Sequence, residues 1–428
     1  MPNYQYYLLL FDHIGLQLIC LLLCAIPMYF IGKKYTHSWF DPLRISFIFV
    51  VFSNGVPLFL YYLGEMPAYL FYYFLLAEFL FWVGFVILAK KQINFSSKKL
   101  IGEKYVANKL FFIFFILFIL NSVITYSLFG LPIFNESRIS TYVGSGGLGI
   151  LSRLNPFFSL YVLMYCYYQL DKNDSRFYKA LSYFVFAVFA ITGILSGSRG
   201  SFLIFLYAYF GYNFFYKKEI PNVRTLIKYF PFIFIGAITV LALTNGGNLI
   251  DTFGELLIRL TSSGDCYYMA YPNEIIRDVH VGNSWTFLFS NLLAPARVID
   301  NAKLPAPIGA QLTGILFPKI DGLLVGPNSR PPIFGYVLFG WMGLLLSFVL
   351  GLFTSFLCFR ISTMFPKGFI SAFFVFYIYN NGIIFISDPT TGMASIFDTI
   401  LNFCVILLFI LIIYASSQMS RKAAAFHY

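Results

Sequence analysis

The chain has 428 residues, of which 59% are hydrophobic and only 11% are charged. A soluble domain of this size could not bury so many apolar side chains, so the composition excludes a soluble protein and predicts one embedded in a membrane. The net charge of +11 must then reflect either membrane topology or an anionic ligand.

Apolar runs of about 20 residues, the length that crosses a hydrocarbon core, recur along the whole chain. They predict an all-α polytopic membrane protein. The eleven expected spans are residues 8–31, 44–63, 66–89, 109–128, 155–170, 179–196, 200–216, 228–244, 333–359, 368–387 and 393–415. No positive charge precedes the first span, and Lys33 and Lys34 follow it, so it does not have the form of a cleavable signal peptide.

The basic residues indicate an orientation, because segments that face the cytoplasm carry an excess of Lys and Arg. With a periplasmic N-terminus and a cytoplasmic C-terminus, most of the cations fall in cytoplasmic segments, and the opposite orientation would invert this rule. We therefore expect a multi-pass protein of the bacterial inner membrane. The cations left outside are Arg138, Arg153, Arg199, Arg259, Arg277, Arg297, Lys303, Lys319 and Arg330.

These outer cations are mostly arginine, whereas the cytoplasmic ones are mostly lysine. Lysine suffices as a point charge against anionic headgroups, but arginine offers a planar fork that fits phosphate or carboxylate. One interpretation is an outer anion-binding site. The other is that individual arginines pair with Glu136, Asp251, Glu255 or Asp278, and the sequence leaves both open.

Two outer segments are long enough to carry function within what is otherwise a single membrane domain over residues 1–428. Residues 129–154 form the first periplasmic loop and residues 245–332 form a large one. Apolar side chains at helical spacing in residues 249–260 predict a helix along the membrane surface. The apolar residues of the large loop predict that it folds back onto the spans and covers an outer cavity.

Motifs for cofactors and metals are weak. The stretch GSGGLG, Gly144–Gly149, fits a dinucleotide-binding fingerprint letter for letter but lies in an outer loop rather than between a strand and a helix. No HExxH, no DxD and no metal-spaced histidine pair occurs, so no metal or cofactor is expected, nor is nucleic acid as a partner. Within the spans, Asp12, Glu78 and Asp398 are ionisable and therefore functional candidates.

An outward-facing site with arginines, aromatic groups and an apolar body suits a lipid-linked pyrophosphate sugar. The lipid tail would lie between helices, the diphosphate would need forked donors, and sugars would stack on tyrosines. Without ATP outside the membrane, the energy would come from the sugar–pyrophosphate bond. Arginines would stabilise the charge that develops on the departing pyrophosphate.

Four stretches, together and in this order, resemble a known family. They are SGSRGSFL (Ser196–Leu203), RLTSSGDCYYMAYP (Arg259–Pro272), LLAPAR ending at Arg297, and GPNSRPPIFGYVLFGWMG (Gly326–Gly343). The chain resembles the bacterial O-antigen polymerases of the Wzy type, and the resemblance in topology covers essentially its whole length. It implies a GT-C-like glycosyltransferase fold that joins undecaprenyl-pyrophosphate-linked oligosaccharide repeat units into a surface polysaccharide, O-antigen or capsule, without a metal. It also implies contacts with membrane lipids and with a chain-length regulator protein.

On this reading, the catalytic candidates are Arg199, Arg259, Arg330 and Asp265. Pro331 and Pro332 fix the backbone beside Arg330, so its side chain would be presented rigidly over the cavity, and a helix cap by Asn328 or Ser329 is compatible with this. Asp265 is the favoured base for an acceptor hydroxyl. The candidate substrate-binding residues are Arg297, Arg277, Asn328, Tyr267, Tyr268 and Gln311.

Three alternatives stay open. A flippase or transporter of lipid-linked oligosaccharide would be expected to have two balanced halves, which the asymmetric outer loop does not suggest. An O-antigen ligase resembles the polymerases, but its family places a histidine where this chain has Ser329 and Arg330. A non-catalytic scaffold is the third.

Overall fold

The computed structural model describes residues 1–90, 92–98, 102–134, 149–172, 175–197, 199–221, 235, 239, 262–300, 303–318 and 326–425. These residues are helical or irregular, and no strand occurs among them. Within them, 8 helices are long and apolar enough to cross a membrane. They are α2 (Ile14–Tyr35), α3 (Pro42–Tyr62), α4 (Ala68–Leu88), α5 (Glu103–Phe129), α7 (Arg176–Leu195), the stretch Pro331–Met364, α16 (Phe369–Ser387) and the part Pro389–Ser417 of α17 (Pro389–Ala425).

The polytopic membrane character is thereby confirmed, and each of these helices matches an expected span. The expected span at 155–170 is the helix α6 (Gly149–Lys172), which is long enough to cross but carries more polar residues. The expected span at 200–216 is a 3-10 turn, the helix α8 (Leu203–Phe210) and a π-helical end, Gly211–Lys217. The expected span at 228–244 and the surface helix at 249–260 lie outside the described residues.

The first span begins later than the apolar pattern indicated. A short helix, α1 (Asn3–Asp12), ends at His13, and α2 starts at Ile14. Asp12 therefore ends α1 as an exposed residue and does not lie within a span, which corrects its assignment. The break removes a carboxylate from the apolar segment, where it would be costly.

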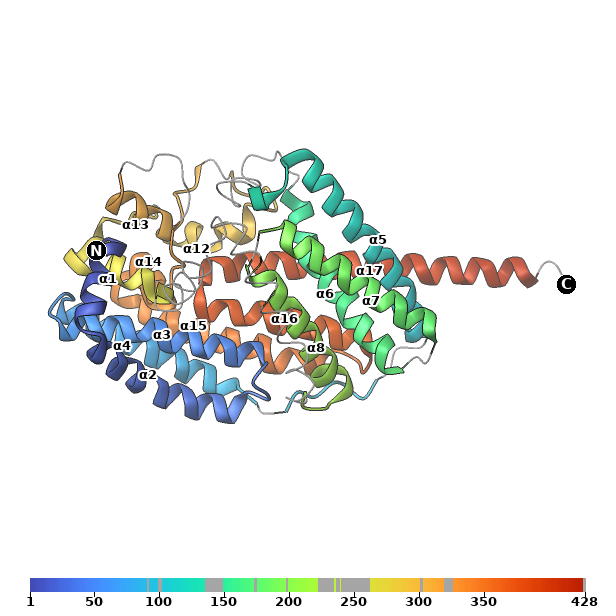
Figure 1. Ribbon diagram of the computed structural model, residues 1–428, viewed down its shortest axis with the longest axis horizontal. Helices are drawn as coiled ribbons and strands as arrows, with labels where there is room; N and C mark the ends of the chain where they lie inside the picture. Colours follow the sequence, from blue (N-terminus) through green and yellow to red (C-terminus); the bar gives the residue numbers. More distant parts are fainter. Residues whose placement is uncertain are drawn as a thin grey trace. The chain divides into compact units, whose positions relative to one another are not determined.

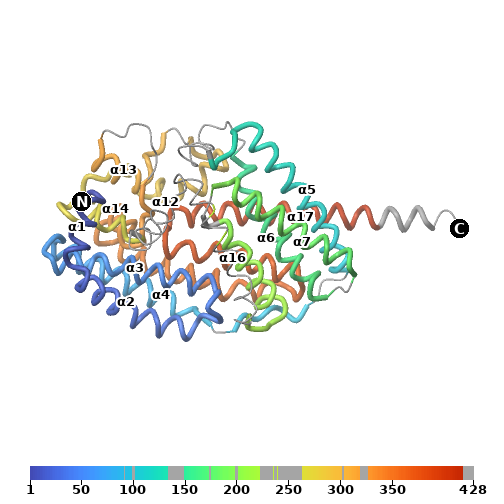
Figure 2. The backbone as a smooth tube through the Cα atoms, viewed as in Figure 1, coloured from blue at the N-terminus to red at the C-terminus, as the bar shows by residue number. Residues whose placement is uncertain are grey.

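Two compact units make up the chain. The first comprises Met1–Ile93, Gly254–Ile361 and Ile378–Phe397, and the second comprises Asn94–Phe253, Ser362–Tyr377 and Asp398–Tyr428. In the first unit, α2, α3 and α4 lie side by side, drawn in blue in Figure 2. In the second unit, α5, α6 and α7 form a group, drawn in teal to green in Figure 1.

Close glycine contacts explain the tightest helix pair of the first unit. Helix α4 packs along α15 (Gly343–Ser355), where a side chain on Gly84 would overlap the backbone at Phe348 and one on Gly351 would overlap Phe81. Membrane helices associate through such small residues because lipid tails leave no hydrophobic driving force between them. Preceding α15, α14 (Pro331–Phe339) ends at Gly340, whose φ of 56° breaks the expected ninth span into two helices.

The described part of the large loop is built from short helices of the first unit. They are the 3-10 turn Ser262–Gly264, α11 (Asp265–Ala270), the 3-10 segment Pro272–Asp278, α12 (Ser284–Leu293) and α13 (Ile308–Leu316). The 3-10 turn and α11 pack on α3, and α11 also contacts α13 and α14. These short helices therefore lie against the membrane helices α3 and α14.

Candidate functional site

The backbone on both sides of Arg330 is constrained by close packing and by prolines. The stretch Gly326–Pro332 starts close to Gly309 of α13: a side chain on Gly326 would overlap the Gly309 backbone, and one on Gly309 would overlap the Pro327 backbone. Within it, Arg330 precedes the two prolines that begin α14, and the Arg330 carbonyl accepts the first hydrogen bond of that helix from Phe334 N, 2.9 Å away. The Arg330 side chain is buried, with only 5% of the residue exposed.

The guanidinium of Arg330 has few partners for a buried charge. Its Nη2 donates a hydrogen bond to the carbonyl oxygen of Ser263 over 3.3 Å. Among the described residues, the Arg330 side chain forms no other hydrogen bond and no ion pair. A guanidinium carries five N–H donors in a fixed fork. Because burying a charge without partners is costly, the remaining donors call for an anion.

The junction between α16 and α17, Ser387–Gly392 (SDPTTG), contacts the Arg330 segment and was not among the predicted site residues. Ser329 Oγ and Thr390 Oγ1 lie 3.2 Å apart, and Asn291 of α12 donates to the Thr390 carbonyl over 3.1 Å. Asp388 accepts from Thr390 N at 3.0 Å and from Thr391 Oγ1 at 2.6 Å, which caps the start of α17. The α16–α17 junction thus holds Ser329, and with it Arg330, against α12.

Burial raises the pKa of Asp388, and hydrogen bonds from Thr391 and Thr390 oppose the rise. The sequence signal for this junction was Asp388, an acidic residue directly before Pro389 at the end of an apolar span. The sequence offered no indication of which outer segment it contacts.

Three ionisable groups converge on Cys266. Burial raises the pKa of its thiol to about 12, Asp265 and Asp388 contribute to the rise, and Arg330 opposes it. Asp265 starts α11, where its Oδ1 accepts from Cys266 N over 2.9 Å, and it is only partly buried. Arg330 and Asp265, two of the predicted catalytic residues, are therefore within electrostatic range of the same thiol, and so is Asp388.

The predicted aromatic residues of α11 are interior. Tyr267 and Tyr268 are both 0% exposed. Tyr267 packs edge-on against Phe74, and Tyr268 stacks on Tyr6 of α1 with ring centroids 4.1 Å apart. Burial raises the pKa of both phenols, so they stay protonated. Neither ring presents an open face, and the Tyr267 hydroxyl is buried without a partner in the described structure.

The remaining predicted binding residues are more peripheral. Arg277 pairs with Glu274 at 2.8 Å, and its guanidinium lies over the Tyr69 ring, so for Arg277 the described contacts include a carboxylate partner. Gln311 bridges backbone groups, accepting from His280 N and donating to the carbonyl of His280, both over 2.9 Å. Asn328 and Arg297 are exposed, and Arg297 has a left-handed backbone with φ of 58°.

Several candidates cannot be placed. Arg259 and most of GSGGLG lie outside the described residues. Arg199 begins the 3-10 turn Arg199–Phe202, but its side chain is also outside the described part.

An apolar groove of about 560 Å³ lies between α2, α3 and α4 in the first unit. Its walls include Leu23, Pro27 and Phe79, while Asn54 and Glu78 are the polar groups in it. Trp82 Nε1 donates to Glu78 Oε2 over 2.9 Å. Glu78 is also within electrostatic range of Arg330, so the groove and the Arg330 site are neighbours.

The third acidic candidate, Asp398, belongs to the second unit. It forms an ion pair with Arg153 of α6 at 2.7 Å, and both side chains are largely buried. Arg153, like Arg277, is therefore an outer arginine with a carboxylate partner, although Asp398 was not among the partners considered for it.

No group of three or more potential metal ligands occurs among the described His, Cys, Asp and Glu residues. Comparison with known proteins finds no matching family model, no similar curated protein and no similar solved structure.

Proposed function

We propose that this protein is a membrane glycosyltransferase that joins lipid-pyrophosphate-linked oligosaccharide repeat units, as the resemblance to Wzy-type polymerases implies. The observation that carries the proposal is the buried Arg330 guanidinium, which has a single acceptor among the described residues. A diphosphate would occupy its unused donors with the bidentate geometry that a guanidinium favours.

In the proposed reaction, a hydroxyl of the acceptor oligosaccharide attacks the anomeric carbon of the donor. A glycosidic C–O bond forms, the C–O bond to the lipid pyrophosphate breaks, and the hydroxyl proton passes to a base. Arg330 stabilises the charge that develops on the leaving pyrophosphate, and Asp265, partly buried and close to the same thiol as Arg330, is the base. Asp388 keeps the α16–α17 junction against Ser329 and so positions Arg330.

The apolar groove of the first unit supports a substrate with a long lipid tail. It is lined by side chains of three membrane helices, and Glu78, one of its polar groups, is within electrostatic range of Arg330. A polyprenyl chain in this groove would leave its pyrophosphate near the arginine. Since the groove is bounded by spans, the lipid would enter from the bilayer.

The finer topology is part of the proposal. It has eleven spans with a GT-C-like arrangement, a periplasmic N-terminus and a cytoplasmic C-terminus in the bacterial inner membrane. The cation distribution supports this orientation. In this proposed orientation, Arg330 and the α16–α17 junction would be on the periplasmic side, where lipid-linked repeat units and a chain-length regulator would meet the enzyme.

The test is incubation of the purified protein, in liposomes, with lipid-linked repeat units. Longer glycan chains on the lipid are expected. Substrate that crosses the bilayer unaltered would instead identify a flippase, and transfer of glycan to a lipid A core acceptor would identify a ligase. A protein that leaves the substrate unchanged and in place in all these assays would have no such activity.

A further inference from the structure

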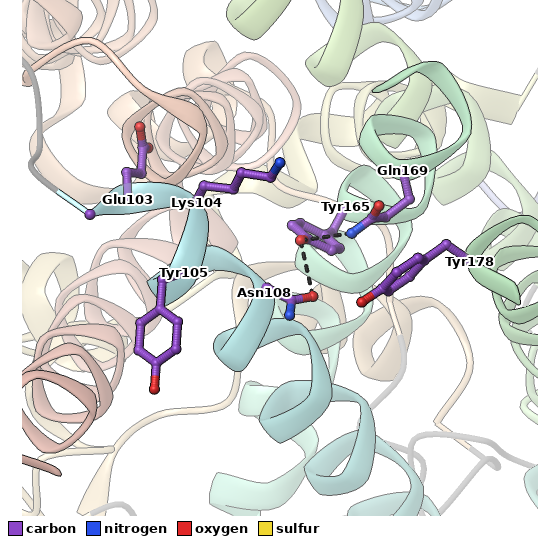
Figure 3. Close-up of a pocket in the computed structure, with 8 residues that line it drawn as sticks. Glu103, Lys104, Tyr105, Asn108, Tyr165, Gln169 and Tyr178 are labelled. Carbon is purple, nitrogen blue, oxygen red and sulfur yellow. Dashed lines mark hydrogen bonds between the residues drawn. The ribbon is translucent and has the colours of Figure 1, made fainter. Parts of the chain in front are cut away.

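A second pocket, of about 750 Å³, lies in the second unit, where α5, α6 and α7 begin or end. Its polar lining comprises Lys104 and Asn108 of α5, Tyr165 and Gln169 of α6, and Tyr178 of α7, as Figure 3 shows. This pocket shares no residue with the Arg330 site, so an inference from it does not depend on the proposed polymerase activity.

Two hydrogen bonds fix the back of the pocket. Gln169 Nε2 donates to the Tyr165 hydroxyl over 2.8 Å, and that hydroxyl donates to Asn108 Oδ1 over 3.3 Å. Tyr165 and Gln169 are buried, so this chain of groups is held rigidly. The amide nitrogen of Asn108 and the hydroxyl of Tyr178 then have no partner among the described residues, and the two side chains point toward each other in Figure 3.

The one carboxylate in the lining is already in use. Glu103 Oε1 accepts from Ile370 N over 2.9 Å and so caps the start of α16. Gly368 makes this possible, because a side chain there would overlap the Glu103 carboxylate. Lys104, one residue further on, extends its amine toward the side of the pocket where Tyr165 and Gln169 lie, and it has no acidic partner in the described structure. The available groups are therefore a cation and two neutral donors.

The pocket also has a defined depth relative to a bilayer. Lys104 is in the first turn of α5 and Tyr178 is in the first turn of α7, and both helices are candidate spans. The ends of spans lie at the level of the lipid headgroups. Tyr105 lines the pocket and is 51% exposed, as is typical of tyrosine at the membrane interface, and Phe177, which packs edge-on against Tyr178, is 66% exposed.

We propose that this pocket binds the headgroup of an anionic phospholipid. The Lys104 ammonium would pair with the phosphodiester, while Asn108 Nδ2 and the Tyr178 hydroxyl donate to its oxygens. The exposed rings of Tyr105 and Phe177 would contact the glycerol and the upper acyl chains. A zwitterionic lipid brings its own cation to this position and would bind less well.

The experiment is native mass spectrometry of the delipidated protein in detergent, titrated with phosphatidylglycerol or phosphatidylcholine. We expect the protein to retain one phosphatidylglycerol molecule. Lys104→Gln should lower the affinity for this lipid about tenfold, the loss typical of one charge-assisted contact. Lys109→Gln is the matched control. Lys109 is about one turn further along α5 and is exposed, as Lys104 is, but it lies over the Tyr105 ring at 5.7 Å and does not line the pocket. The Lys109→Gln variant should bind phosphatidylglycerol with the affinity of the parent protein.

Tyr178→Phe removes one hydroxyl without changing the charge, and it should also weaken the binding of phosphatidylglycerol. This second variant keeps the proposal testable if Lys104→Gln does not fold. Equal effects of the two lysine substitutions, or equal retention of both lipids, would overturn the proposal. Displacement of phosphatidylglycerol by millimolar inorganic phosphate would overturn it as well, because the site would then accept a soluble anion.

Discussion

The guanidinium of Arg330 donates a hydrogen bond of 3.3 Å to the carbonyl oxygen of Ser263, a residue 67 positions earlier in the chain. This contact joins the segment that starts α14 to the turn that starts α11. A backbone carbonyl is a neutral acceptor, so it orients the guanidinium without neutralising it. Arg330 is thus held in place while its charge remains available to an anion.

If Arg330 stabilises a pyrophosphate leaving group, Arg330→Lys should lower the polymerisation rate about 10²–10³-fold, roughly 2.7–4 kcal/mol of barrier. A lysine retains the charge but cannot reproduce the bidentate fork. The measurement is glycan elongation by the purified variant, normalised to the amount of folded protein in the membrane.

Arg153→Lys is the matched control. Its partner is Asp398 at 2.7 Å, and a lysine can still form that ion pair, so activity should stay near the parental level. Parental activity in Arg330→Lys together with an inactive Arg153→Lys would place the chemistry near α6 instead.

Polymerisation should not depend on a divalent metal. The chain has no DxD motif, and its candidate site offers arginine donors for the charge that a metal would otherwise stabilise. The activity of the purified protein should be unchanged after dialysis against EDTA. Activity that disappears in EDTA and returns with Mg²⁺ or Mn²⁺ would contradict this expectation.

The helices were largely predictable because a bilayer imposes a length of apolar sequence that local patterns reveal directly. The 8 apolar helices follow that rule. α6 was predicted as a span although polar residues reduce its hydropathy, and it buries a continuous run, Phe157–Tyr167, within its unit. The break at His13 was missed because the apolar pattern runs across it.

The candidate site was only partly predictable. Arg330 could be identified because prolines beside an arginine are a local signal. Its contact with Ser263 and the contact between Ser329 and Thr390, 61 residues apart, depend on how distant segments pack. Tyr267 and Tyr268 were predicted to bind sugars because they follow Asp265 in the large outer loop, but sequence alone could not reveal that α1 and α4 cover them.

The proposed orientation can be tested by thiol labelling. A cysteine at Thr286 of α12 should react with an impermeant maleimide added to spheroplasts, and one at Ser97 should react only after the cells are opened. Both positions are exposed. The native Cys266 is buried and its thiol has a pKa of about 12, so it should remain unlabelled in the parent. Labelling at Ser97 alone would reverse the topology and move the Arg330 site to the cytoplasm.

A buried carboxyl group predicts a distinctive pH dependence of stability. Asp41 is 0% exposed at the start of α3, where it accepts from Leu43 N at 3.0 Å and from the Tyr379 hydroxyl at 2.6 Å. Burial raises its pKa from 3.8 to about 6 in spite of these hydrogen bonds. Between about pH 4 and pH 6 the folded protein therefore binds a proton that the unfolded chain does not.

The free energy of unfolding should consequently fall as the pH rises through this window, by about 3 kcal/mol at roughly 1.4 kcal/mol per pKa unit. Asp41→Asn keeps an acceptor for Leu43 N and Tyr379 but cannot ionise, so its stability relative to the parent should increase from pH 4.5 to pH 7.5. Thermal unfolding in detergent across this range measures the difference. Asp278→Asn, at an exposed position of the same unit, is the control and should follow the parental profile. If Asp41→Asn and the parent have parallel profiles, the Asp41 carboxyl does not take up a proton in this range, and its hydrogen bonds outweigh its burial.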